Sequence, residues 1–273
     1  MNPETPAGLR AALLQRLRFE RDLGLDAVRP VPLETRQAAQ NEFATGSHGQ
    51  PTAGAARATP APDAAAQLFD AGESKDIAAL SPAEKSKRWE TLEVRALGCT
   101  RCVLHRGRTK VVFGDGNRQA RLVFVGEGPG ADEDRTGVPF VGKAGQLLNK
   151  IIGAMGLQRE DVYICNIVKC RPPENRTPLP DEVALCQPFL EEQLALLAPQ
   201  AIVALGSPAA KALLKTSEGI TQLRGRWRLY KGTRVMPTYH PAFVLRQYTA
   251  QVRRQVWDDM QLVMKYLKEE GAV

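Results

Sequence analysis

The chain has 273 residues, a formal net charge of +7 and five cysteines, which suits one large domain or two small ones and favours a polyanionic partner such as nucleic acid. It has no run of about 18 uncharged apolar residues, and charges occur throughout residues 1–25, so we expect neither a membrane span nor a signal peptide. A cytoplasmic location follows, in which cysteines are thiols or metal ligands rather than disulfides.

The first part of the chain is predicted to contain one helix and a linker. Leu9, Leu13 and Leu17 recur at helical spacing with arginines between them, which predicts an amphipathic helix within residues 1–28. Residues 29–82 shift to Ala, Pro, Thr, Gln and Gly and lose periodicity, as disordered linkers do. The helix is either a frayed extension or a docking peptide for a protein partner.

Ordered structure is expected over residues 83–273. Ser81-Pro-Ala-Glu is a helix-start signal, and the helix that it opens is expected to end near Gly98. Short apolar runs then alternate with amphipathic segments. The expected strands are 111–113, 122–125, 162–168 and 201–205, with a hairpin over 223–235, and the expected helices are 143–155, 181–197, 207–214 and 250–270. This alternation predicts an α/β fold, a mainly parallel sheet covered by helices on both faces.

One expected strand runs directly into a glycine-rich loop. Residues 121–130 read Arg-Leu-Val-Phe-Val-Gly-Glu-Gly-Pro-Gly, and an acidic run over 132–134 follows. Ligands of open α/β sheets bind at the carboxyl ends of strands, so we expect this loop to form the floor of an active site. Its G-x-G-x-G spacing and acidic residues disfavour a phosphate or dinucleotide site. Glu127 suits recognition of a neutral polar ring or a general-base role, with a surface turn acid as the plainer interpretation.

Four of the five cysteines form two pairs. Cys99 and Cys102 make a C-x-x-C, and 15 residues separate Cys170 from Cys186. Two pairs of thiols suit a tetrahedral sulfur site, either zinc or an iron–sulfur cluster, and the spacing does not separate these. A thioredoxin-like redox motif is disfavoured, since the C-x-x-C precedes the first core strand. Cys165 lies within an apolar run and is expected to be a buried core thiol.

Three further features carry polar groups toward the expected site. Asn166 interrupts an apolar strand, so its amide needs partners, either a neighbouring loop or the edge of a bound base. His240 precedes a proline after a strand, which directs its imidazole to the same rim as Glu127. The arginine-rich turn around Arg226 suits contact with a DNA backbone, or it is a solvated basic hairpin.

From about residue 97 to residue 267, these segments resemble the uracil-DNA glycosylase superfamily. The resemblance is to family 4, the iron–sulfur enzymes of bacteria and archaea, more than to family 5. It is carried by residues 99–102 (Cys-Thr-Arg-Cys), 112–117, 126–130, 137–148, 166–173 (Asn-Ile-Val-Lys-Cys-Arg-Pro-Pro) and 240–242 (His-Pro-Ala). The resemblance implies a three-layer α/β/α sandwich around a short, mainly parallel sheet. It does not cover the N-terminal 80 or so residues, which composition predicts to be a disordered extension.

The resemblance also implies roles for the matching positions. Phe140 corresponds to the aromatic that stacks on the flipped uracil, Asn166 to the residue that reads the base edge, and His240 to the donor to uracil O2. Glu127 and Gly128 line the pocket floor. A structural [4Fe–4S] cluster is implied, with four ligands: Cys99, Cys102, Cys170 and Cys186.

One position departs from the wider superfamily. Some glycosylases carry a water-activating Asp where this chain has Gly128. Glu127 is therefore the first candidate for activating water and Glu133 the second, unless Glu133 excludes the thymine methyl. No basic insertion follows Cys170, so we expect turnover rather than covalent trapping of uracil.

We therefore expect a monomeric, monofunctional uracil-DNA glycosylase of base excision repair, which acts on uracil-containing DNA and leaves an abasic site. Leu245 and Arg246 either wedge into the gap left by the flipped base or merely start a helix. Arg226 is the third expected DNA contact. The alternative function is a non-catalytic nucleic-acid-binding module with a zinc site.

Overall fold

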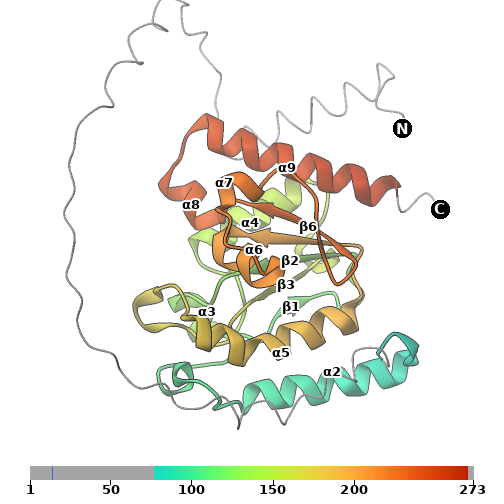
Figure 1. Ribbon diagram of the computed structural model, residues 1–273, viewed down its shortest axis with the longest axis vertical. Coiled ribbons are helices and arrows are strands. Elements are labelled where there is room, and N and C mark those ends of the chain that lie inside the picture. Colours follow the sequence, from blue (N-terminus) through green and yellow to red (C-terminus); the bar gives the residue numbers. More distant parts are fainter. Residues whose placement is uncertain (1–13, 15–76, 270–273) are drawn as a thin grey trace, which may run out of the picture.

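The computed structural model describes Leu14 and residues 77–269 (Figure 1). The helix predicted within residues 1–28, Leu14 apart, and most of the linker predicted over 29–82 lie outside the described residues. Description resumes at a short 3-10 helix, Ile77–Ala79, inside the range predicted as linker. Ile77 is buried in the core, so packed structure extends to the N-terminal side of residue 83. None of the described helices is long and apolar enough to cross a membrane.

A six-stranded sheet forms the centre of the described domain, in the order β1-β3-β2-β4-β6-β5. Its four central strands are parallel: β3 (Tyr163–Asn166), β2 (Leu122–Gly126), β4 (Ala201–Leu205) and β6 (Thr233–Thr238). The short edge strands β1 (Asp115–Gly116) and β5 (Arg228–Tyr230) run antiparallel to their neighbours. Gly126 pairs with Asn166, so β2 and β3 end at the same level of the sheet.

Helices cover both faces of this sheet, as predicted (Figure 1). Alternate strand residues face opposite layers, because side chains along a strand alternate between faces. Val123, Val125 and Ile202 pack in one core cluster with α5 (Pro180–Leu197) and α6 (Gly206–Leu214), while Phe124 and Val203 pack in the other with α4 (Lys143–Ala154) and α9 (Ala250–Glu269). The predicted α/β/α sandwich around a mainly parallel sheet is confirmed.

An additional helix, α2 (Pro82–Leu97), packs along the outer side of α5 (Figure 1). The residues at its N-terminus fix where the helix starts. The Ser81 hydroxyl accepts from the Glu84 amide, and the Glu84 carboxylate accepts from the Ser81 amide at 2.7 Å, which together form a capping box. The helix ends at Gly98, where the sequence predicted its end.

Several predicted boundaries were wrong. Residues 111–113 are buried but form no strand, because the Val112 amide donates to the Lys169 carbonyl (2.8 Å), which lies past the end of β3. Strand β1 forms at Asp115–Gly116 instead. The strand predicted over 162–168 is limited to β3. The acidic run, expected in a loop, forms the short helix α3 (Ala131–Thr136), where carboxylates near the helix N-terminus are favourable.

The last differences lie in the C-terminal third. The hairpin predicted over 223–235 begins only with β5, since a short helix, α7 (Ile220–Leu223), occupies its predicted start. After β6, the chain forms α8 (Pro241–Arg246) before the long helix α9. Leu245 and Arg246 therefore lie in the last turn of a helix, not at its start.

Candidate active site

A cavity of about 430 Å³ opens at the carboxyl ends of β2, β3 and β6. This volume suits a small ligand. Its walls come from segments far apart in the sequence: the loop after β2, the loop before α4, the end of β3, the segment 172–178 and the start of α8. The lining residues include Glu127, Gly128, Glu133, Phe140, Asn166, Thr177, His240 and Arg246. Of the residues predicted for base binding and catalysis, all six line this cavity.

Glycines allow the floor of the cavity to be closely packed. A Cβ atom added to Gly126 would lie 2.5 Å from Asn166 Oδ1 and 2.5 Å from Phe140 Cζ. A Cβ atom on Gly128 would lie 2.9 Å from Val168 Cγ2. The glycine-rich loop therefore serves the close approach of an amide and an aromatic ring.

Asn166 presents an unpaired amide oxygen at this floor. Its side chain is 1% exposed, and its Oδ1 atom has no hydrogen-bond partner among the described residues. Buried polar atoms without a partner are rare in folded proteins and costly. Among the described residues, no neighbouring loop donates a hydrogen bond to Oδ1. The oxygen is therefore available to an N–H group of a ligand.

His240 is the N-cap of α8 and is held in one tautomer. Its Nδ1 atom accepts a hydrogen bond from the Ala242 amide at 3.1 Å. Burial, followed by the positive charge of Arg246, lowers the pKa of His240 to about 4. The imidazole is therefore neutral at physiological pH, and because Nδ1 is an acceptor, the proton lies on Nε2. Nε2 is the nitrogen that can donate to a ligand.

Phe140 lies beside His240, with ring centroids 5.5 Å apart and an interplanar angle of 32°. Its ring is almost fully buried at the cavity wall. The backbone of Phe140 has φ of 53°, a left-handed conformation that is uncommon for residues other than glycine. Such strain persists only where the surrounding structure enforces it, and it clusters at functional sites.

Glu127 supplies a half-buried carboxyl group at the cavity. Burial raises the pKa of Glu127 above its usual value, although a hydrogen bond with Thr177 and the charge of Arg246 oppose the rise. A carboxyl group with a raised pKa is suited to accept a proton from water near neutral pH. Its position agrees with the prediction that Glu127 is a site residue rather than a surface turn acid.

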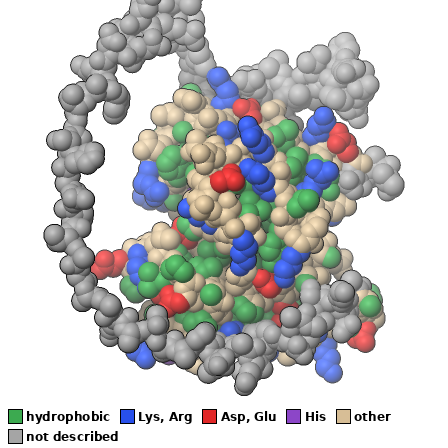
Figure 2. Space-filling view, in the orientation of Figure 1, with side chains coloured by type: hydrophobic (Ala, Val, Ile, Leu, Met, Phe, Trp, Pro, Cys, Tyr) green, Lys and Arg blue, Asp and Glu red, His purple; other side chains and the backbone are tan. Residues whose placement is uncertain are grey.

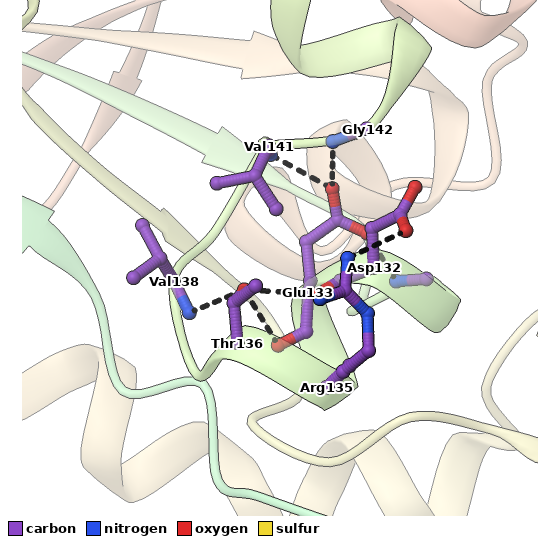
Figure 3. A network of polar contacts seen from close by, with 8 residues as sticks. Asp132, Glu133, Arg135, Thr136, Val138, Val141 and Gly142 are labelled. Carbon is purple, nitrogen blue, oxygen red and sulfur yellow. Dashed lines mark hydrogen bonds and ion pairs between the residues drawn. The ribbon is translucent and has the colours of Figure 1, made fainter.

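Glu133 has a different environment, in which its carboxylate binds backbone amides (Figure 3). One oxygen accepts from the amides of Val141 and Gly142, each at 2.9 Å, and the other accepts from Gly130 at 3.1 Å. These bonds join the start of α3 to the end of the loop that carries Phe140, just before α4. Since three backbone amides already donate to its carboxylate, Glu133 is less suited than Glu127 to activate water.

The segment between Cys170 and Cys186 forms one wall of the cavity, and sequence reasoning missed it. Arg176 and Thr177 line the cavity. The Arg176 guanidinium donates to both oxygens of Glu182, at 2.8 and 2.6 Å, and the Glu182 side chain is fully buried. In the sequence, the only indication of this wall was that the proline-rich segment lies between Cys170 and Cys186, two expected metal ligands.

Four cysteines gather around a second cavity, between the C-terminal end of α2 and α5. Cys99, Cys102, Cys170 and Cys186 all line it, with Arg108 and Lys169 beside them. Arg108 Nη1 lies 3.3 Å from Cys170 Sγ, and the Lys169 amide lies 3.3 Å from Cys186 Sγ. Burial is the main cause that raises the pKa of Cys102 and of Cys170. Cys165 is a fully buried core thiol, in agreement with its prediction.

The donor set around this cavity, four cysteine thiols, has the chemistry of a sulfur site, either a zinc ion or an iron–sulfur cluster. Within the described residues, no group of three or more His, Cys, Asp or Glu side chains is placed to hold one metal ion. The four thiols nevertheless share one cavity. A single zinc ion needs its sulfur ligands within about 2.3 Å of the metal, whereas an iron–sulfur cluster is larger and is also held by four cysteines.

The three residues predicted to contact DNA are surface residues. Leu245 is 39% exposed, and Arg246 is exposed and lines the cavity mouth. Arg226 is exposed but does not line the cavity. The basic turn is smaller than expected, because Arg224 pairs with the buried Asp259. Figure 2 shows Lys and Arg side chains spread over one face among acidic ones, not gathered in a single patch.

Comparisons with known proteins show the family to which the chain is similar. Residues 113–261 match the model of the Uracil DNA glycosylase superfamily. The Type-4 uracil-DNA glycosylase of Thermotoga maritima is 47% identical over 186 residues, which are 67% of this chain and 96% of the relative. The Type-4 uracil-DNA glycosylase of Archaeoglobus fulgidus is 43% identical over 61% of this chain and 87% of the relative. That of Pyrobaculum aerophilum is 44% identical over 55% of this chain and 80% of the relative.

Proposed function

The chain belongs to the uracil DNA glycosylase superfamily and within it to the type 4 uracil-DNA glycosylases, and we propose that the cavity at the ends of β2, β3 and β6 is its active site. The enzyme excises uracil from DNA in DNA repair by hydrolysing the N-glycosyl bond. The observation that carries the assignment of the site is the unpaired Oδ1 atom of Asn166, buried in the same cavity as the neutral imidazole of His240.

In this proposal the cavity receives one base that has left the duplex. The ring of Phe140 supplies a stacking face, and the Asn166 amide reads the edge of uracil through paired donor and acceptor atoms. Uracil is neutral, so a cavity lined by an aromatic ring, an amide and an imidazole suits it better than a phosphate-binding loop.

The chemistry follows from the same residues. When the bond between C1′ and N1 breaks, its electron pair remains on uracil, and negative charge develops at O2. The Nε2–H group of His240 donates to that oxygen, and fixed donors of this kind contribute a few kcal/mol, about 2.7–4 where one was removed in another enzyme. Water adds to C1′, and Glu127 accepts its proton. Glu133 holds the loop that carries Phe140.

A [4Fe–4S] cluster bound by Cys99, Cys102, Cys170 and Cys186 belongs to this proposal. When bound, the cluster would supply a structural link between three parts of the chain. The segment after α2 contributes two thiols, the segment after β3 contributes one, and α5 contributes the fourth. Because Cys170 and Cys186 flank the segment 172–178, this link would also fix one wall of the active site.

DNA contacts complete the proposal. Arg246 lines the cavity mouth and Leu245 is its exposed neighbour, so we place them against the strand on either side of the flipped nucleotide. Arg226 contacts the backbone farther away. The domain boundaries 1–28, 29–82 and 83–273, the monomeric state and a protein partner for the N-terminal helix stay predictions.

A nicking assay tests the proposed site. The chain is incubated with an oligonucleotide that contains one uracil, and alkali then cleaves any abasic site. We expect product from the wild type and strong loss in Asn166→Ala and His240→Ala. Asn117→Ala, in an exposed turn, is the control and retains activity. Absence of product from the wild type on single- and double-stranded uracil substrates would refute the function. A colourless protein that contains zinc would refute the cluster.

A further inference from the structure

We propose that Arg159 is the positioning residue for Phe140, which it fixes in the orientation that stacks on the base. The proposal rests on the proposed function of the cavity. Arg159 lies in a short 3-10 helix, Arg159–Asp161, between α4 and β3. It does not line the cavity, so any effect on excision must pass through another residue.

The guanidinium of Arg159 binds the backbone of the strained segment directly. Its Nη2 donates to the Pro139 carbonyl at 2.6 Å, and its Nη1 lies 3.3 Å from the Phe140 carbonyl oxygen. One planar group therefore holds two consecutive carbonyls. A forked guanidinium fixes both the position and the orientation of its partners, as a single ammonium does not.

The same guanidinium is itself held by two further side chains. Its Nε lies 3.1 Å from Asp115 Oδ2 on β1, and its Nη1 lies 3.1 Å from Asn149 Oδ1 on α4. Only 19% of the Arg159 side chain is exposed. Its donors therefore connect the sheet edge and a core helix to the Phe140 loop. These contacts fix the position of the loop relative to the sheet and α4.

The geometry of Phe140 explains why such an anchor is needed. Its left-handed φ of 53° is strained, and without an anchor the loop would relax to an ordinary conformation. The other side of the peptide is confined by Gly145, where a Cβ atom would lie 1.8 Å from the Phe140 carbonyl oxygen. Glycine admits the carbonyl and Arg159 holds it, and together they fix the ring beside His240.

The test is a double-mutant cycle measured as single-turnover excision. Arg159→Met removes the fork, and we expect excision to slow about 10- to 100-fold, the range that small misplacements of binding groups produce. Affinity for DNA with a non-cleavable uridine analogue is expected to change less than about 2-fold, because Arg159 does not line the cavity. In a Phe140→Ala background, Arg159→Met is expected to cause no further slowing, because the residue through which it acts is absent.

Arg121→Met is the matched control. Arg121 also donates to a side-chain amide, Gln200 Oε1 at 2.7 Å, and to a backbone carbonyl, Leu267 at 2.8 Å. Its loss is expected to lower the melting temperature but not the excision rate. Arg159→Lys, a milder second variant, keeps a cation beside Asp115 without the fork and is expected to show the same dependence on Phe140 with a smaller loss.

The outcomes separate this inference from the function on which it rests. If the wild type excises uracil but the effects of Arg159→Met and Phe140→Ala multiply independently, Arg159 is only a stabilising residue and the inference is overturned. It is also overturned if Phe140→Ala excises at the wild-type rate, or if Arg159→Lys is as active as wild type where Arg159→Met does not fold. If the wild type excises no uracil, the proposed function itself fails.

Discussion

Replacement of His240 by asparagine should abolish a specific pH dependence of stability. In the folded protein, the pKa of His240 is about 4, whereas an unperturbed histidine has 6.5. The unfolded chain therefore binds a proton more tightly than the folded protein. The corresponding stability is fully present above pH 6.5 and is lost as pH falls from 6.5 toward 4.

The magnitude follows from these two pKa values. Between pH 7.5 and pH 5, the unfolded histidine becomes almost fully protonated, while the folded one stays almost fully neutral. The linkage relation then gives a loss of about 2 kcal/mol in the free energy of unfolding. Two charged groups affect the histidine: Arg246 supports its neutral form, and Glu133 opposes it.

Urea unfolding at pH 7.5 and pH 5 measures this loss, with matched iron content in both proteins. Asparagine is the suitable replacement, since it keeps an N-cap acceptor for α8 but does not titrate. Carboxylates contribute equally to both proteins, so the difference between their pH dependences isolates His240. Equal pH dependence in wild type and His240→Asn would show that the imidazole is not held neutral, and the donor role derived for Nε2 would lose its basis.

Three other predictions concern the floor of the cavity, the general base Glu127 and the cysteine ligands of the cluster. Gly126→Ala should reduce excision about 100-fold in a single-turnover assay, since its Cβ would meet Asn166 at 2.5 Å; an unchanged rate would contradict the close packing. Glu127→Gln should slow excision about 10²- to 10⁴-fold. It should also remove the acidic limb of the pH–rate profile, which lies above pH 4.5 in wild type because burial raises the pKa of Glu127. If the acidic limb persists in the variant, another group causes it and Glu127 is not the general base. Cys186→Ala should lose iron and visible absorbance, whereas Cys165→Ala should keep both; equal iron content in the two variants would contradict the ligand set.

The central strands could be predicted from the sequence because the patterns that indicate them lie within a few neighbouring residues. Continuous apolar runs such as 122–125 and 201–205 bury on both faces, as central parallel strands do. The start of α2 was marked by a capping box within four residues. These elements depend on neighbours in the chain, so composition and spacing were sufficient to locate them.

The missed elements depend on distant partners. Residues 111–113 have strand-like composition, but their backbone bonds are decided by the position of Lys169, which the sequence order does not give. The wall at 172–178 is shaped by the pair between Arg176 and the buried Glu182, which no spacing rule predicts. Arg159 was overlooked for the same reason, since its carbonyl partners lie about 20 residues earlier in the chain.

In the proposed site, the pairing of Gly126 with Asn166 makes hydrogen-bond register one determinant of how the base is bound. Asn166 belongs to a strand, so its direction is set by the same ladder that fills the core, and a slip of one residue would turn it to the opposite face. Cys165, which packs in the core cluster, would then occupy its place. In the proposed site, a change of base specificity made through the side chain at 166 must keep this register, because the register decides which face that side chain occupies.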